Sequence, residues 1–278
     1  MQAISRTLLS SHLQDCLFLN RPFVMPPNTT LNELFGVQNG VVPTTTPTMG
    51  YLAIGNGGHK FTVGANNIPK NDPVQHVATD AALYNHLPFV LREVNNDLDP
   101  ITAGSYALRR LETHNGLQYF AYYLKRLPLN TVVPDMEYNT VLNGVTTTTA
   151  YVYTSANLNP TPPALNSSGV NVVSGDTVAA SAKMNIVFTP AEVQELINVA
   201  TVMYQDPGFA IISELALCSG VDKTVQSPGV GNAVINFNEA IAVQTLGFIN
   251  GFYPMASTTN GLSILIDIGS SEPMFTLI

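Results

Sequence analysis

The sequence is poor in charged residues. Only 11% of its 278 residues are charged, and 11 Lys and Arg stand against 19 Asp and Glu, which gives a net charge of −8. A typical globular domain is about a quarter charged. The acidic balance excludes the basic footprint of a dedicated nucleic-acid binder, and the scarcity of charge excludes a long solvated coiled coil. Because 45% of the residues are hydrophobic, intrinsic disorder is excluded as well.

Cysteine and long apolar runs are also scarce. The two cysteines, Cys16 and Cys218, form neither a disulfide framework nor a metal-ligand motif, so we expect buried or free thiols in a reducing compartment. No stretch holds 18 consecutive apolar residues, and the first residues lack the continuous apolar region of a signal peptide. These absences favour a soluble, non-secreted chain without a membrane partner.

Neutral polar residues take the place of charge. The chain has 27 Thr, 26 Asn and 20 Gly. Hydroxyl and amide groups can pair across a subunit interface without the desolvation cost of burying charge. The composition therefore indicates a protein that works inside an assembly, with much of its surface covered by other subunits.

The chain divides into an arm and a domain. Residues 1–50 hold Pro22, Pro26-Pro27, Pro43 and Pro47 among scattered apolar residues, which predicts an extended N-terminal arm. Residues 51–278 are expected to form a single α+β domain with a β-strand and loop excursion at about 130–182. An extended arm of this kind can lie across a neighbouring subunit; a flexible terminus is the alternative.

Two Asn-Gly pairs predict β-hairpins, because both central residues of a type I′ turn need positive φ. Asn115-Gly116 divides residues 106–113 from 117–127, and Asn143-Gly144 divides 136–142 from 145–153. Other strands are expected at residues 51–54, 176–188, 209–218 and 262–268, with a long loop at 155–175.

The helix signals are fewer. Thr189-Pro190-Ala191-Glu192 combines a cap, a proline at the first helical position and a capping box, so a helix should begin there. Apolar residues spaced three and four apart predict a helical segment within 73–94, capped by Thr79 or Asp80, that is kinked at Pro88 or restarts there. A last helix is expected from Asn236 or Asn238 to about Phe252. The sum is an α+β fold, a β-rich body of antiparallel sheets with two or three helices.

We find no catalytic, cofactor-binding or metal site in the sequence, and we expect no enzyme. The glycine-rich run Gly55–Lys60 fails both the P-loop and the dinucleotide fingerprint, which leaves a tight turn. The five histidines (His12, His59, His76, His86 and His114) show no metal-binding spacing, so we expect surface or hydrogen-bonded side chains. Cys218 lies in an apolar strand, where a thiol is buried and inert.

Two groups of charged residues stand out. Glu214 falls in the middle of an apolar strand, and it is either paired with an arginine of Arg109-Arg110 at a subunit interface or exposed on the outer face of the sheet. The basic residues Arg109, Arg110, Lys125 and Arg126 should lie side by side across the first hairpin, where charge balance between strands explains them.

Three segments carry a resemblance to a known family. Residues 50–59, 80–93 and 213–222 resemble virion structural proteins of contractile-tailed bacteriophages, in the group assigned to the neck or collar between head and tail. The resemblance runs from about residue 50 to the C-terminus. It implies a non-enzymatic ring subunit, with six- or twelve-fold symmetry, located in the virion after assembly in the bacterial cytoplasm. It also implies other neck, portal or tail proteins as partners, and DNA passing through the ring without specific binding.

Other functions stay open at this point. A carbohydrate- or receptor-binding β module fits the Tyr and Asn residues of the β segments, and another tail component such as a tail terminator fits the same resemblance. An enzyme is the third alternative.

Overall fold

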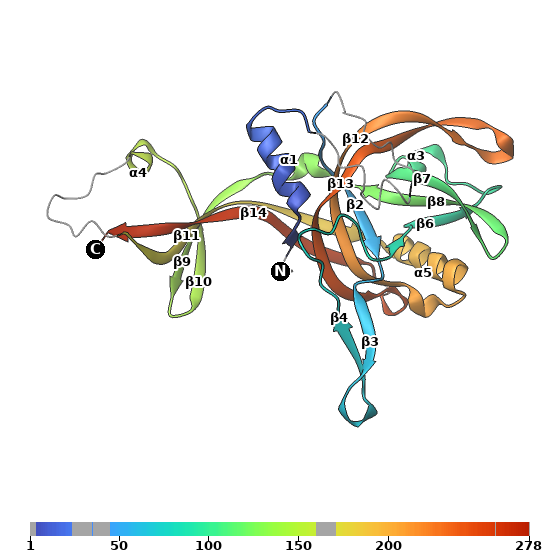
Figure 1. Ribbon diagram of the computed structural model, residues 1–278, viewed down its shortest axis with the longest axis horizontal. Helices are drawn as coiled ribbons and strands as arrows, with labels where there is room; N and C mark the ends of the chain where they lie inside the picture. The colour runs from blue at the N-terminus through green and yellow to red at the C-terminus, as the bar shows by residue number, and fades with distance from the viewer. Residues whose placement is uncertain (1–3, 24–34, 36–44, 160–170, 259, 278) are drawn as a thin grey trace. The chain divides into compact units, whose positions relative to one another are not determined.

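The computed structural model describes residues 4–23, 35, 45–159, 171–258 and 260–277. These residues form mostly antiparallel strands together with four α-helices (Figure 1), which confirms the predicted α+β class and its β-rich body. The chain makes two compact units. The larger unit, which we call the body, contains Gln2–Pro128 and Val187–Ser263, and the smaller one contains Leu129–Ile186 and Ile264–Ile278. The sequence predicted a single domain over 51–278; its excursion at about 130–182 lies in the small unit, which also includes the last strand.

The body is built on an eight-stranded sheet with the order β1-β13-β12-β2-β8-β6, in which β5 pairs with β2 and β7 pairs with β8. Its strands are β1 (Ser5–Arg6), β2 (Thr48–Gly55), β5 (His86–Leu87), β6 (Val90–Glu93), β7 (Tyr106–His114), β8 (Leu117–Arg126), β12 (Ile211–Pro228) and β13 (Val234–Pro254). A separate two-stranded sheet joins β3 (His59–Val63) and β4 (Pro69–Pro73).

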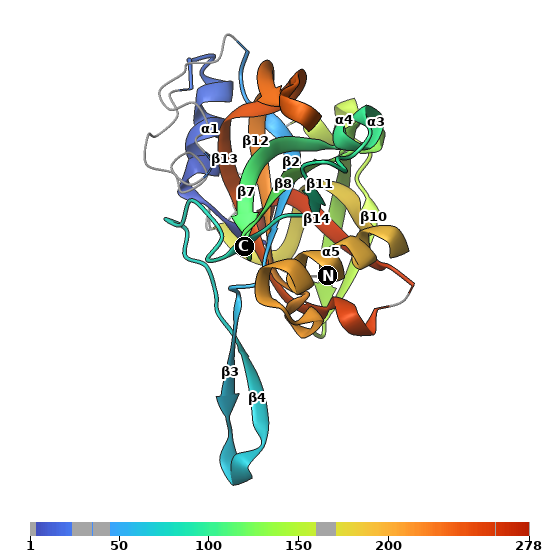
Figure 2. The ribbon, with the colours of Figure 1, turned by 90° about the vertical axis from the view of Figure 1, so that its right-hand side faces the viewer.

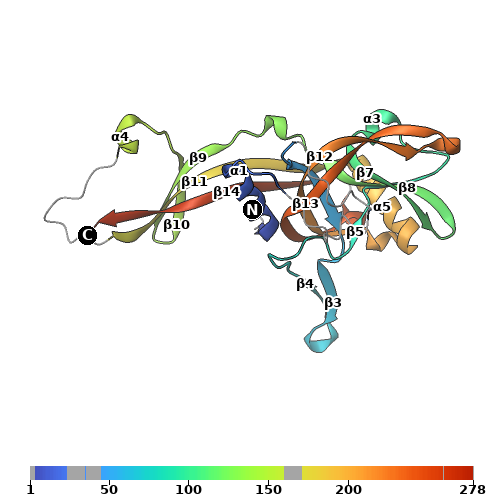
Figure 3. The same cartoon turned by 45° about the horizontal axis from the view of Figure 1, so that its top comes forward.

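The body includes the helices α1 (Leu8–Phe18), α3 (Pro100–Ala103) and α5 (Pro190–Tyr204). α5 begins as the sequence predicts. Thr189 accepts a hydrogen bond from the Glu192 N–H while the Glu192 side chain accepts one from the Thr189 N–H, and Pro190 takes the first helical position. α5 contacts β6, it lies beside β7 and β8 (Figure 3), and its Val199 is fully buried in the core.

The small unit contains a four-stranded sheet with the order β10-β9-β11-β14. Its strands are β9 (Asp135–Leu142), β10 (Val145–Ala150), β11 (Asn171–Phe188) and β14 (Leu262–Leu277), of which β11 and β14 continue into the body, and its helix is α4 (Ser155–Leu158). The predicted loop at 155–175 contains α4 and the start of β11, and residues 160–170 lie outside the described residues.

Both Asn-Gly hairpins are confirmed. Asn115 and Gly116 have φ of 52° and 80°, and Asn143 and Gly144 have φ of 52° and 77°, as a type I′ turn requires. The first pair joins β7 to β8 and the second joins β9 to β10. Local turn chemistry therefore sets the register of both strand pairs.

The helix predicted within 73–94 is wrong. This segment is a loop followed by β5 and β6. The backbone N–H groups of Tyr84 and Asn85 donate to the Glu214 carboxylate in place of a carbonyl one turn back. Asp80 does not cap a helix either; its carboxylate accepts from the Val77 N–H. The Glu214 carboxylate, which is distant in the sequence, thus accepts the hydrogen bonds that the Tyr84 and Asn85 N–H groups would have donated within a helix.

The helix predicted from Asn236 or Asn238 to Phe252 is also wrong, because this segment is strand β13. β13 is buried almost continuously from Glu239 to Ile249. A strand buried on both faces has no alternation of polar and apolar residues, so its apolar spacing does not differ from that of a buried helix.

The predicted extended arm at 1–50 contains a helix. Thr7 caps α1 by accepting a hydrogen bond from the Ser10 N–H at 3.1 Å. Leu13 and Cys16 are buried against Ala242 of β13, so the helix packs on β13 as part of the body (Figure 1). Most residues from 24 to 44 lie outside the described residues.

Candidate functional site at the root of the β3–β4 hairpin

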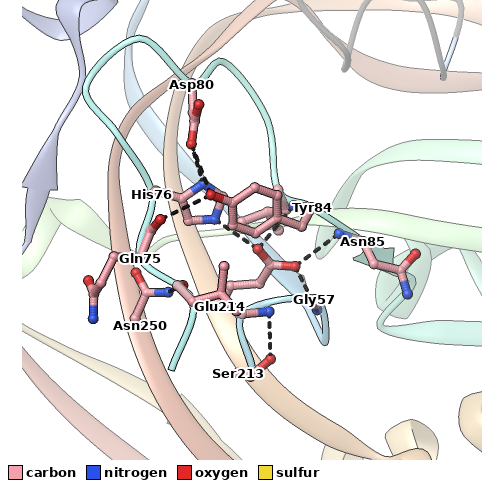
Figure 4. Close-up of polar contacts among 12 residues, drawn as sticks. Gly57, Gln75, His76, Asp80, Tyr84, Asn85, Ser213, Glu214 and Asn250 are labelled. Carbon is pink, nitrogen blue, oxygen red and sulfur yellow. Dashed lines mark hydrogen bonds and ion pairs between the residues drawn. The ribbon is translucent and has the colours of Figure 1, made fainter. Parts of the chain in front are cut away.

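A buried carboxylate lies at the centre of the body. Glu214 of β12 is fully buried and is paired with Gly55 of β2 on one side and Asn250 of β13 on the other. Its side chain accepts four hydrogen bonds (Figure 4). One oxygen, Oε1, accepts from the N–H groups of Gly57 at 2.8 Å and Asn85 at 3.0 Å. The other, Oε2, accepts from the Tyr84 N–H at 3.0 Å and lies 2.8 Å from the ring nitrogen Nε2 of His76.

His76 connects two carboxylates. Its Nε2 lies against Glu214, and its Nδ1 lies 3.0 Å from Oδ2 of Asp80. The imidazole is stacked between two aromatic rings, with centroid distances of 4.2 Å to Tyr84 and 3.8 Å to Phe248. The side chain has no exposed surface. Stacking and hydrogen bonds together leave this ring one orientation.

The electrostatics of Glu214 follow from these partners. Burial by itself raises the pKa of a carboxyl group, because it disfavours the charged form. The hydrogen bonds from His76 and from the N–H groups of Asn85, Tyr84 and Gly57 outweigh burial, and the net effect lowers the pKa of Glu214 below its usual value. The site therefore holds a buried negative charge at neutral pH.

The glycine-rich loop is explained by its closeness to this charge. A Cβ on Gly55 would lie 2.5 Å from Oε1 of Glu214 and 2.4 Å from the Asn85 carbonyl oxygen, and a Cβ on Gly57 would lie 2.6 Å from Cβ of Tyr84. No side chain fits at either position. The glycines of this loop therefore allow the backbone to reach the carboxylate.

The same contacts hold both ends of the β3–β4 hairpin. Gly57 and Gly58 directly precede β3, and the N–H of Gly58 donates to Oγ of Ser213 at 3.0 Å. After β4, the N–H of Val74 donates to the Gly58 carbonyl at 2.9 Å, and the Asn250 amide donates to the Val74 carbonyl. His76 follows two residues later. The buried cluster is therefore the root that fixes the hairpin on β12 and β13.

The hairpin extends away from the rest of the body (Figure 2), and the register of β3 with β4 gives it one polar and one apolar face. Thr62 donates to the Asp72 carboxylate, and Lys70 pairs with the same group, on the polar face. Phe61 and Val63 on the other face are 65% and 71% exposed, and Ile68 in the turn is 62% exposed. Large apolar side chains thus gather on a projecting element.

The apolar face begins in an aromatic cluster at the root. His59 makes edge contacts with Phe61 at 5.0 Å and with Phe252 of β13 at 5.1 Å between ring centroids. Burial lowers the pKa of His59, against a smaller effect of Glu214 in the other direction. This favours the neutral imidazole and keeps the face free of positive charge.

The cluster is a clamp and is not suited to catalysis. The side chains of His76 and Glu214 have no exposed surface, and both oxygens of the carboxylate are taken by internal donors. A general acid or base has to reach the proton that it transfers. What this arrangement can do is hold three separate chain segments in one geometry.

A hollow beside the clamp is lined by polar groups that have partners within the chain. It has a volume of about 480 Å³ and is lined in part by His86, Arg110 and Glu112. These polar groups already have partners inside the protein. His86 accepts from the Leu83 N–H, Arg110 binds Glu239, and Glu112 binds His114 and Tyr123.

Both predicted roles of Glu214 are wrong, because it is buried and is paired with His76 and not with Arg109 or Arg110. The partner lies 138 positions away in the sequence, and no local pattern pointed to it. His76 itself was expected only to be a surface or hydrogen-bonded side chain. The glycines at 55–58 were the one visible signal, since such a run marks a close approach of the backbone.

The sequence predicted that the four basic residues of the first hairpin lie side by side across it, but they do not, because Arg109 and Arg110 face Tyr122 and Ala121 while Lys125 faces Tyr106. Their charges are balanced by carboxylates from outside the hairpin. Each has an acidic partner within 2.7 Å: Arg109 with Asp97, Arg110 with Glu239, Lys125 with Glu192, and Arg126 with Asp222. Cys218 is fully buried, and burial raises the pKa of its thiol to about 12, so the thiolate is strongly disfavoured.

Within the described part of the chain, no group of three His, Cys, Asp or Glu side chains is placed to hold a metal ion, and no helix has the length and apolar character needed to cross a membrane. No curated protein and no solved structure matches the chain. A family model matches residues 1–277, and the chain therefore belongs to that family, which is described as a family of unknown function, DUF7208.

Proposed function

We propose that this chain is a non-enzymatic structural subunit that assembles into a homo-oligomeric ring, and that the ring belongs to the neck or collar of a tailed-phage virion. The observation that carries the assembly is the rigidly rooted hairpin with its exposed apolar face. The phage assignment is supported by the resemblance of residues 50–59, 80–93 and 213–222, which include the glycine loop and the strand segment that form the root.

The hairpin makes sense as a contact arm. A two-stranded hairpin alone is marginally stable in water, and burying an ion costs several kcal/mol before its partners compensate. The body nevertheless buries Glu214 to hold the two ends of this hairpin. An arm that is already fixed loses little conformational entropy when its apolar face is covered by a neighbour. Phe61, Val63 and Ile68 are the residues that such a neighbour would cover.

The charge distribution supports assembly. Most arginines and lysines that the structure describes are bound to carboxylates of the same chain, which leaves neutral hydroxyl and amide groups to meet other subunits. Head-to-tail contacts between identical subunits close into a ring when the rotation permits. We propose six- or twelve-fold symmetry, other neck, portal or tail proteins as partners, and an acidic channel through which DNA passes without specific binding.

The assembly is tested by light scattering and negative-stain microscopy of the purified full-length chain. We expect rings for the unchanged chain and smaller species for Phe61→Asp, because a carboxylate on the apolar face opposes burial. Ile101→Asp is the matched control, since Ile101 is 88% exposed on α3, away from the hairpin, and it should leave the rings intact. A chain that stays monomeric and binds glycans would overturn the proposal in favour of the carbohydrate-binding module.

The phage assignment has its own test. The reading frames that neighbour the coding sequence should encode portal, sheath and tail-tube proteins. A neighbourhood without virion genes would contradict the virion location and leave the assembly itself to the microscopy.

A further inference from the structure

Strand β10 forms an open edge of the small unit. It is the terminal strand of the order β10-β9-β11-β14, and no described strand pairs with its outer side. All six of its residues, Val145–Ala150, are exposed. An edge strand presents a row of unpaired backbone groups, which is a template for pairing with another chain.

β10 lacks the features that protect most natural edges. Proteins block such edges with lysines, prolines, inward charges or bulges. The sequence of β10 is Val-Thr-Thr-Thr-Thr-Ala, with no charge and no proline, and its six pairs with β9 run without a register shift. The opposite edge strand, β14, contains Asp267, Glu272 and Pro273. Only one of the two edges of this sheet is therefore unprotected.

The hairpin geometry shows which backbone groups face outward. Leu142 and Val145 flank a two-residue turn and form a hydrogen-bonded pair, so the hydrogen-bonded pairs with β9 continue at every second residue. The Tyr151 N–H donates to the Met136 carbonyl at 2.8 Å, in agreement with this phase. The N–H and C=O groups of Thr146, Thr148 and Ala150 consequently face away from β9.

The absence of charge around β10 favours a second copy of this chain as the partner. Two copies of a chain with a net charge of −8 repel each other unless they meet where charge is absent. No residue from 138 to 150 is charged. A second copy can therefore approach this edge without placing like charges opposite each other.

We propose that β10 pairs antiparallel with β10 of a second copy, about a two-fold axis at Thr148. Thr148 then faces Thr148 of the partner, and Thr146 faces the partner's Ala150. Each facing pair exchanges two backbone hydrogen bonds, so that one sheet runs through both copies. The dimer goes beyond the proposed function and does not depend on the phage assignment or on the β3–β4 arm.

A proline at an outward-facing position tests the pairing. Thr148→Pro removes an N–H that points to the partner and leaves the hydrogen bonds to β9 in place. Thr148→Ala is the matched control, because it loses the same hydroxyl contact with Asn139 but keeps the N–H. By sedimentation of the full-length chain, we expect Thr148→Pro to lose the dimer contact and Thr148→Ala to keep it. Equal association of the two variants, or a monomeric unchanged chain, would overturn the proposal.

A cysteine pair gives a direct readout of the register. Facing residues of a hydrogen-bonded antiparallel pair have Cα atoms about 5.5 Å apart, which suits a disulfide. Thr148→Cys should form a covalent dimer under mild oxidation, while Thr147→Cys should not, because residue 147 faces residue 149 of the partner. The two native cysteines are buried and do not compete. Equal cross-linking at both positions, or none at either, would overturn the proposed axis.

Discussion

Glu214 shows what a single residue does in this fold. Replacing it with Gln keeps the shape but places an amide among groups that all donate hydrogen bonds, and it leaves His76 buried without its partner carboxylate. Removing a carboxylate that accepts several buried hydrogen bonds is strongly destabilising, so we expect Glu214→Gln to lower the free energy of unfolding by about 3 kcal/mol. Urea denaturation at pH 7 measures the change.

The control for this variant is Glu195→Gln. Glu195 pairs with Arg92, and both side chains are about a quarter exposed. A partly exposed ion pair contributes about 1 kcal/mol or less, so this substitution should have a small effect. If the two variants were equally stable, the buried carboxylate would not be what holds the root together.

His86 gives the body a dependence on pH. The pKa of His86 is lowered to about 4, mainly by burial. Two smaller effects act as well: Glu214 raises this pKa and His76 lowers it. In the unfolded chain its pKa is near 6.5. Between these values the unfolded chain binds a proton that the folded chain does not, so stability falls as the pH falls.

We therefore expect the unchanged chain to lose about 2 kcal/mol of stability between pH 7 and pH 5 through this residue. His86→Gln keeps an acceptor for the Leu83 N–H and should flatten the profile over that range. Glu214, whose pKa is lowered, adds a separate loss only as the pH falls below the usual range of a carboxyl group. Urea midpoints at several pH values separate the two, and parallel profiles for both chains would refute the role of His86.

At the scale of elements, α5 offers the clearest test of a local signal. The hydroxyl of Thr189 accepts from the Glu192 N–H at 3.2 Å. Removing such a cap lowers stability by about 1 kcal/mol. We expect this effect from Thr189→Ala, measured by urea denaturation.

Thr154→Ala is the natural comparison, since Thr154 caps the four-residue helix α4 in the same way. Because α4 has no buried residue, it contributes little to global unfolding, and this variant should change the midpoint very little. A larger effect at Thr154 than at Thr189 would contradict the view that a cap matters only when its helix is packed.

The elements that could be predicted are those whose chemistry is local. The turns Asn115-Gly116 and Asn143-Gly144 and the capping box at Thr189 need only their own residues, and all three are where the sequence placed them. The helix prediction for 73–94 failed because backbone N–H groups of this segment donate to Glu214, which is more than a hundred positions away. The helix prediction in the region of β13 failed because burial of the strand on both faces removes the alternation of polar and apolar residues that identifies a strand.

The candidate site lies beyond such local signals for the same reason. Glu214 was noticed as an acidic residue in an apolar strand, but its partners come from the loops on either side of the β3–β4 hairpin and from residues 84 and 85. Sheet topology brings these segments together, and composition and spacing carry no information on that topology.

The whole molecule is not uniform in stability. In the body, Leu52, Ile54 and Leu215 are completely buried in neighbouring strands. In the small unit, β9 and β10 contain no buried residue. Regions with few buried apolar contacts open locally, at a lower free energy than global unfolding. We therefore expect the exposed strands of the small unit to open at a lower free energy than the strands of the body.

Hydrogen exchange of the dilute chain measures this difference. We expect amides at the centre of β2 and β12 to exchange at least about a thousandfold more slowly than those of β9 and β10, because they exchange only through global unfolding. The amides of Thr146 and Thr148, which face away from β9, should be nearly unprotected. At high protein concentration the pairing of two β10 edges should slow these two amides, while Leu215 stays unchanged. Equal protection of both units at low concentration would contradict this account, because β9 and β10 would then be as stable as the body without any partner.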